Sequence, residues 1–187
     1  MEPSAASTGR GVRADARRNE DALLEAAKQI FADQGIDAPV REIAARAGVG
    51  MGTLYRRFPT RSDLIAGVFR REVDACTAAA AELARRHAPA DAVAFWLERY
   101  WEFLTTKRGL AAALHSGDPT FETLPGYFRA NFEPALRALL DAAVASKQLR
   151  GDVEPWDLLR AVGALAGTAN SWPMVALLID GLRVRAN

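Results

Sequence analysis

A short stretch of the chain, residues 40–61, contains residue types that suit contact with nucleic acid. Tyrosine and arginine side chains stand there beside two small residues, Gly52 and Thr53. Small residues let a helix backbone approach base edges, while tyrosine and arginine reach the phosphates on either side. The stretch carries five arginines against one acidic residue, Glu42. Because the whole chain has a formal net charge of only +1, this local excess predicts a basic surface patch that binds a polyanion.

Two short helices must position these side chains. Residues 40–47 show apolar residues at three- and four-residue spacing, and residues 51–58 end at Pro59. Gly48 falls where a helix ends in the left-handed conformation that glycine adopts at little cost. The pattern predicts a helix-turn-helix. The alternative is a basic, solvated helical hairpin.

A wider set of residues, from about Asn19 to Phe69, carries a family pattern. Its members are Ala26-Ala27, Phe31 before Gly35, Ile43-Ala44, Ala47-Gly48-Val49, Gly52-Thr53-Leu54-Tyr55, Phe58 and Leu64. With these residues the first third of the chain resembles the DNA-binding domain of TetR-family (tetracycline-repressor-like) transcriptional regulators. The resemblance implies an all-α fold of about nine helices, with a three-helix head and a helical body for ligand binding and dimerisation.

The resemblance also assigns DNA-contacting roles by position. An early position of the first motif helix reaches a base, the start of the second reads base edges, and its end contacts phosphates. The residues at these positions are Arg41, Met51, Gly52, Thr53, Tyr55, Arg56, Arg57 and Arg61. Two departures stand out: Arg61 replaces the usual lysine, and no serine or threonine stands next to the start of the helix at residue 40. Since Met51 and Gly52 offer no side-chain hydrogen bonds, base reading is expected to use thymine methyl groups and DNA shape.

The chain order predicts three regions. Residues 1–15 lack periodicity and are interpreted as a disordered arm, either a solvated tail or a segment that reaches DNA. Residues 16–70 form the helix-turn-helix domain, and residues 71–187 form the effector-binding and dimerisation domain. No apolar run is long enough to span a bilayer and the N-terminus is polar, so a cytoplasmic location is expected.

Catalytic and metal-binding patterns are not recognisable. Cys76 is the only cysteine and is read as an interior helix residue, and the two histidines, His87 and His115, lie far apart. The glycine-rich residues 48–52 lack the Lys-Ser/Thr pair of a phosphate-binding loop. We therefore expect no enzyme activity, no cofactor and no metal.

Aromatic residues gather in the second half of the chain. They can form a packed core, or some of them can line an apolar pocket for a small hydrophobic or aromatic effector, as the resemblance implies. The pocket candidates are Trp96, Tyr100, Phe103, His115 and Phe128.

The last two predicted helices combine apolar stripes with small residues. They can complete the core of one chain or pack against the same pair from a second chain. The predicted dimer contacts are Trp156, Leu159, Val162, Gly163, Val175, Leu178 and Leu182. A homodimer suits a palindromic site in double-stranded DNA, since one helix-turn-helix reads few base pairs.

These observations predict a DNA-binding transcriptional regulator. We expect it to repress transcription and the effector to relieve that repression. The alternative is a helical protein-interaction module or aromatic-pocket binding protein without DNA specificity. Steep salt dependence of DNA binding separates the two.

Overall fold

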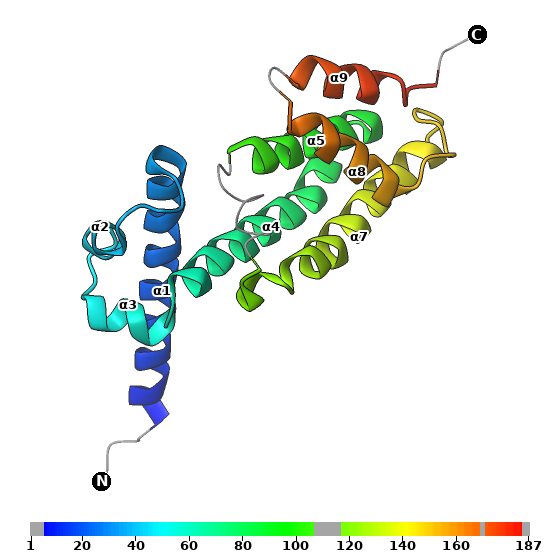
Figure 1. Ribbon diagram of the computed structural model, residues 1–187. Helices are drawn as coiled ribbons and strands as arrows, with labels where there is room; N and C mark the ends of the chain where they lie inside the picture. Colours follow the sequence, from blue (N-terminus) through cyan, green and yellow to red (C-terminus); the bar gives the residue numbers. More distant parts are fainter. Residues whose placement is uncertain (1–5, 107–116, 169–170, 185–187) are drawn as a thin grey trace. The chain divides into compact units, whose positions relative to one another are not determined.

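The computed structural model describes residues 6–106, 117–168 and 171–184, and these are mainly helical (Figure 1). Within these ranges an isolated antiparallel bridge, Leu149 to Arg183, is the one β pairing. The all-α prediction is confirmed. The sequence also predicts a short helix at residues 110–115, which lie outside the described ranges. The elements are α1 (Ala6–Gln34), α2 (Val40–Arg46), α3 (Met51–Arg57), α4 (Arg61–Arg86), α5 (Pro89–Thr106), the 3-10 helix η1 (Pro119–Phe121), α7 (Leu124–Ala145), α8 (Pro155–Ala166) and α9 (Trp172–Asp180).

The described residues form two compact units. The first, here called the head, contains residues 6–69 and 117–121, and the second, the body, contains residues 70–106, 122–168 and 171–184. The division falls inside α4, between Phe69 and Arg70, so one continuous helix contributes to both units. That residues 117–121 join the head was not predicted.

The head is held together by apolar residues from all four of its helices. Leu23 of α1, Ile43 of α2, Leu54 of α3 and Leu64 of α4 are each at most 1% exposed. Gly67 allows a close approach of α4, because a Cβ there would lie 2.9 Å from the Phe58 ring. Replacing this glycine would force the ring to move and so displace the end of α3.

Local hydrogen bonds fix the turn between α2 and α3 and the start of α4. Gly48 has a φ of +69°, the left-handed conformation predicted from the sequence. The Val49 amide donates to the Ala44 carbonyl oxygen at 3.0 Å, which closes the end of α2. At the start of α4, the Thr60 amide donates to Asp63 at 2.9 Å and the Asp63 amide donates to the Thr60 hydroxyl at 3.1 Å. This reciprocal capping fixes where α4 begins.

The structure differs from the sequence prediction at two helix starts. α1 begins at Ala6, so most of the expected arm is helical. Alanine and arginine favour this extension whereas Gly9 and Gly11 oppose it, and a helix already anchored by its core residues extends at little cost. The sequence that follows residue 119 predicts a long helix to about Lys147, interrupted at Pro125. In the structure Pro125 instead lies in the first turn of α7, where its missing N–H is not needed.

The body packs α5 against α7 and α8, and α8 against α9. Trp96 is fully buried and its indole N–H donates to the Cys76 carbonyl oxygen at 2.9 Å, which joins α5 to α4. The Trp101 indole N–H donates to the buried Ser171 hydroxyl at 2.9 Å, which joins α5 to the segment that leads into α9. The two indole N–H groups brought into this core are thus paired, which offsets the cost of burying them.

Candidate functional site

The outer face of α3 combines exposed apolar and cationic side chains. Met51 is 37% exposed and Tyr55 48% exposed, whereas Leu54 and Phe58 are buried against the rest of the head. Arg56 and Arg57 are also exposed at the end of the helix. The two buried residues lie four positions apart, so they orient the helix and leave its other side to solvent.

The eight predicted DNA-contacting residues mostly share this exposure. Six are exposed, whereas Thr53 and Arg61 are half-buried. Arg61 donates from Nη1 to the Ile36 carbonyl oxygen at 2.6 Å, so part of its guanidinium holds the loop between α1 and α2. The exposed members are Arg41, Met51, Gly52, Tyr55, Arg56 and Arg57.

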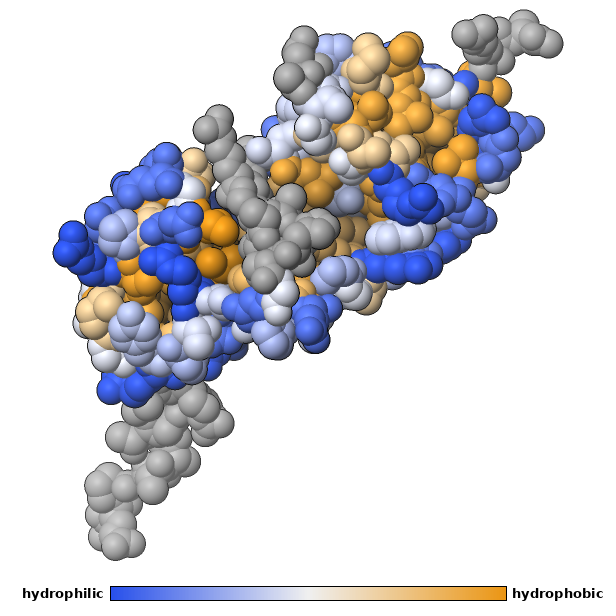
Figure 2. All heavy atoms as spheres, in the orientation of Figure 1, coloured by the Kyte–Doolittle hydropathy of each residue, from blue (hydrophilic) through white to orange (hydrophobic). Residues whose placement is uncertain are grey.

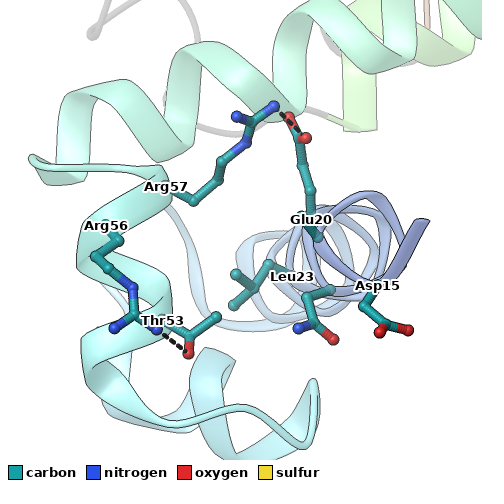
Figure 3. Close-up of a pocket in the computed structure, with 8 residues that line it drawn as sticks. Asp15, Glu20, Leu23, Thr53, Arg56 and Arg57 are labelled. Atoms are coloured by element: carbon teal, nitrogen blue, oxygen red, sulfur yellow. Dashed lines mark hydrogen bonds and ion pairs between the residues drawn. The ribbon is translucent and has the colours of Figure 1, made fainter. Parts of the chain in front are cut away.

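Thr53, at the start of α3, has a defined hydrogen-bonding state. Arg56 donates from Nη2 to the Thr53 hydroxyl oxygen at 3.0 Å (Figure 3). A hydroxyl that accepts one hydrogen bond still has its own proton to donate. Thr53 therefore presents a donor and a methyl group at the surface of α3.

Arg57 is paired with an acidic residue of α1 that the sequence reasoning missed. It donates from Nη2 to the Glu20 carboxylate (Figure 3), and the two side chains are 57% and 25% exposed. The residues lie 37 positions apart, so no local sequence signal pointed to the pair. An ion pair with this much contact to water contributes about 0.2–1 kcal/mol, little enough for another anion to replace the carboxylate.

A hollow of about 430 Å³ lies beside this pair, between α1 and α3 (Figure 3). The α1 side carries the acidic residues Asp15 and Glu20, and the α3 side carries the cationic residues Arg56 and Arg57. The hollow is therefore lined by opposite charges on its two walls, with water able to enter between them.

Four of the five predicted effector-pocket residues are brought together in the body. Trp96, Tyr100 and Phe103 of α5 are buried, and Phe128 of α7 is half-buried. The Trp96 and Tyr100 rings are stacked with centroids 5.9 Å apart, and Phe103 meets Phe128 edge-on at 5.8 Å. This is an aromatic cluster with favourable ring geometry. His115 lies outside the described residues.

Burial raises the pKa of one group in this cluster and of one group beside it. It raises the pKa of the Cys76 thiol to about 12 and also raises the pKa of the Tyr100 phenol. Both therefore remain protonated and neutral near neutral pH. The Thr77 hydroxyl, next in sequence to Cys76, is buried without a hydrogen-bond partner.

The predicted dimer residues fall into two groups. Leu159, Val162, Val175 and Leu182 are at most 4% exposed in the single chain, so they serve its core. These four fit the alternative interpretation, in which the two helices complete the core of one chain, because a side chain buried by its own chain has little surface left for a partner. Trp156, Gly163 and Leu178 are half-buried and remain partly accessible.

Two residues that were not predicted carry the exposed apolar surface of α9. Met174 is 52% exposed and Leu177 is 65% exposed. Figure 2 shows apolar surface gathered over α8 and α9. A large, contiguous apolar surface of this kind commonly marks an interaction site.

The described residues contain neither a metal-binding cluster nor a membrane-spanning helix. No group of three or more His, Cys, Asp or Glu side chains is placed to hold a metal ion. None of the described helices is both long and apolar enough to cross a membrane.

Two family models of transcriptional regulators match this chain, one in its N-terminal part and one in its C-terminal part. Residues 23–68 match the family model of bacterial regulatory proteins of the tetR family. Residues 88–184 match the model described as "Transcriptional regulator SbtR-like, C-terminal domain". An HTH-type transcriptional regulator of Staphylococcus aureus is 39% identical over 64 residues, which is 34% of this chain and 35% of that protein. The chain thus matches about a third of the length of these curated relatives.

Solved structures extend the likeness to almost the whole chain. A TetR transcriptional regulator from Streptomyces coelicolor is 34% identical, with a TM-score of 0.73 over 89% of this chain and 99% of that one. A TetR regulatory protein from Mycobacterium vanbaalenii is 35% identical, with a TM-score of 0.75 over 92% of this chain and 99% of that one. The chain belongs to the TetR family of transcriptional regulators.

Proposed function

We propose that this chain binds a palindromic operator as a homodimer and represses transcription until a small hydrophobic or aromatic molecule releases it. The observation that carries the proposal is the outer face of α3, with a tyrosine and two arginines exposed beside Gly52 and Thr53. Such a face suits the major groove, where the small residues meet base edges and the longer ones meet phosphates. A regulator of this kind works in the cytoplasm, where the genome lies.

Base reading is proposed to be sparse. Met51 supplies an apolar contact, Gly52 allows a close approach, and Thr53 supplies both a methyl group and a hydroxyl donor. Thymine presents a methyl group and an acceptor oxygen in the major groove, which matches that pair of groups. Arg41, Tyr55 and Arg57 then fix the register through the DNA backbone.

The dimer is proposed to form through the apolar surface of α8 and α9. Met174 and Leu177 supply its exposed apolar area, and the predicted contacts Trp156, Gly163 and Leu178 remain partly accessible. Pairing two chains around a two-fold axis presents two recognition helices to two half-sites. A monomer would contact one half-site and lose most of the affinity.

The effector is proposed to bind beside the aromatic cluster of Trp96, Tyr100, Phe103 and Phe128, with His115 as a further candidate. The proposal is supported by the four aromatic rings that α5 and α7 bring together. Since α4 contains residues of both units, it is the element through which the ligand acts on the head. A coupling free energy of about 1–3 kcal/mol would change operator affinity about 5- to 150-fold.

The first test is enrichment of sheared genomic DNA on the purified protein, followed by sequencing. The expected result is a palindromic motif whose binding weakens steeply as salt is raised. Absence of any enriched motif at low salt, together with salt-insensitive retention, would contradict DNA binding.

The effector proposal needs its own test. A panel of small aromatic and aliphatic compounds is screened by thermal shift, and the hits are added to the operator complex. A stabilising compound that also releases DNA supports the proposal. A compound that stabilises the protein without changing operator affinity contradicts effector control through that site.

A further inference from the structure

We propose that Glu20 is a specificity-determining residue, whose carboxylate holds Arg57 away from DNA phosphates until the operator itself is bound. The inference rests on the proposed DNA binding and concerns a residue outside the helix-turn-helix. Glu20 lies on α1 and meets the guanidinium of Arg57, a residue on the outer face of α3 (Figure 3).

The Glu20 carboxylate occupies Arg57 in the way that a DNA phosphate would. Arginine binds carboxylate and phosphate oxygens through the same N–H groups, so one guanidinium nitrogen serves either partner. Nη2 of Arg57 is directed at Glu20 in the free protein. A phosphate that takes the N–H now donated to Glu20 must displace the carboxylate.

Burial and exposure decide which partner can leave. Glu20 is 25% exposed on its helix, whereas Arg57 is 57% exposed. The arginine is long and faces water, so it is the member of the pair that can turn toward DNA. The hollow of about 430 Å³ beside the pair leaves room for this movement.

The exchange is expected to differ between the operator and other DNA. On the operator, α3 enters the major groove fully and brings a phosphate to Arg57. On other sequences the protein is held by the general attraction of the backbone and no phosphate is fixed at Arg57, so Glu20 keeps the guanidinium for more of the time. In each head, the carboxylate therefore removes one cationic contact from non-specific binding. The operator complex keeps that contact.

The test compares Glu20→Gln with the unaltered protein on two duplexes of equal length. One is a sequence enriched from the genome, and the other is an alternating inosine–cytosine duplex. For the second duplex, affinity should rise several-fold and the slope of log K against log salt should steepen by about one unit for each bound head. For the first duplex, the slope should stay unchanged and the affinity should rise less, so the ratio of the two affinities falls.

Two further variants distinguish loss of the Glu20–Arg57 ion pair from a general change in the charge of the head. Asp33→Asn removes the same charge from an exposed position of α1 and should leave the affinity ratio unchanged. In an Arg57→Ala background, Glu20→Gln should have no effect. Equal gains on both duplexes, a loss on both, or the same result with Asp33→Asn would overturn the inference. If the unaltered protein shows no salt-dependent binding to either duplex, the proposed function itself fails, which is a different result.

Discussion

The outer face of α3 and the outer face of α9 both expose side chains that a single folded chain does not need. On α3 these are Tyr55, Arg56 and Arg57, and on α9 they are Met174 and Leu177. The first set suits a highly charged partner and the second suits an apolar one. Binding through charges weakens with added salt, whereas burial of apolar area does not. The two surfaces can therefore be tested separately in one protein.

Breaking the apolar surface should have the largest effect. Leu177→Asp places a charge where two chains are proposed to meet, at a cost of about 3 kcal/mol or more, so the dimer dissociation constant should rise about 100-fold. Sedimentation at micromolar protein concentration measures this directly. Operator affinity should fall with it, because one head alone contacts one half-site.

Ala142→Asp is the control for that change, since Ala142 is exposed on α7. It should leave the dimer intact. A Leu177→Asp protein that remains dimeric would place the interface elsewhere.

Removing a cation from the other surface should have the next largest effect. Arg57→Ala should lower operator affinity roughly tenfold and flatten the salt slope by about one unit for each head. Fluorescence anisotropy over a salt series gives both values. The dimer dissociation constant should not change, and a change there would mean that the two surfaces are not independent.

A neutral contact on the same face should have a smaller and salt-independent effect. Tyr55→Phe removes a hydroxyl that is proposed to donate to phosphate, so operator affinity should fall about two- to tenfold at every salt concentration. Tyr127→Phe in the body serves as the matched control and should leave DNA binding unchanged. A change in salt slope with Tyr55→Phe would show that the loss is not that of a neutral hydrogen bond.

The last prediction concerns the proposed contact between the Thr53 methyl group and a thymine. Thr53→Ser keeps the hydroxyl that accepts from Arg56 and removes one methyl group, worth about 0.8 kcal/mol or roughly fourfold. The loss should fall at one thymine position when binding is measured across operator variants. A uniform loss at all positions would mean that the methyl group packs within the head.

Local sequence signals predicted the head well. Gly48 and Pro59 mark helix ends through interactions among neighbouring residues, so α2 and α3 lie where the sequence indicated. The start of α1 was less predictable. Its first residues are mostly polar or glycine and form no apolar stripe, so the helix there depends on being continuous with an anchored one.

The sequence by itself therefore determined the all-α class, the helix-turn-helix and the exposed set on α3, because each depends on spacing within one helix or one turn. Only the tertiary structure decided which apolar residues of α8 and α9 enter the core. α9 is apolar on both faces, so its sequence pattern cannot separate the buried Val175 from the exposed Leu177. The pairing of Glu20 with Arg57 was decided in the same way, since two charges 37 residues apart meet only when α1 and α3 pack together.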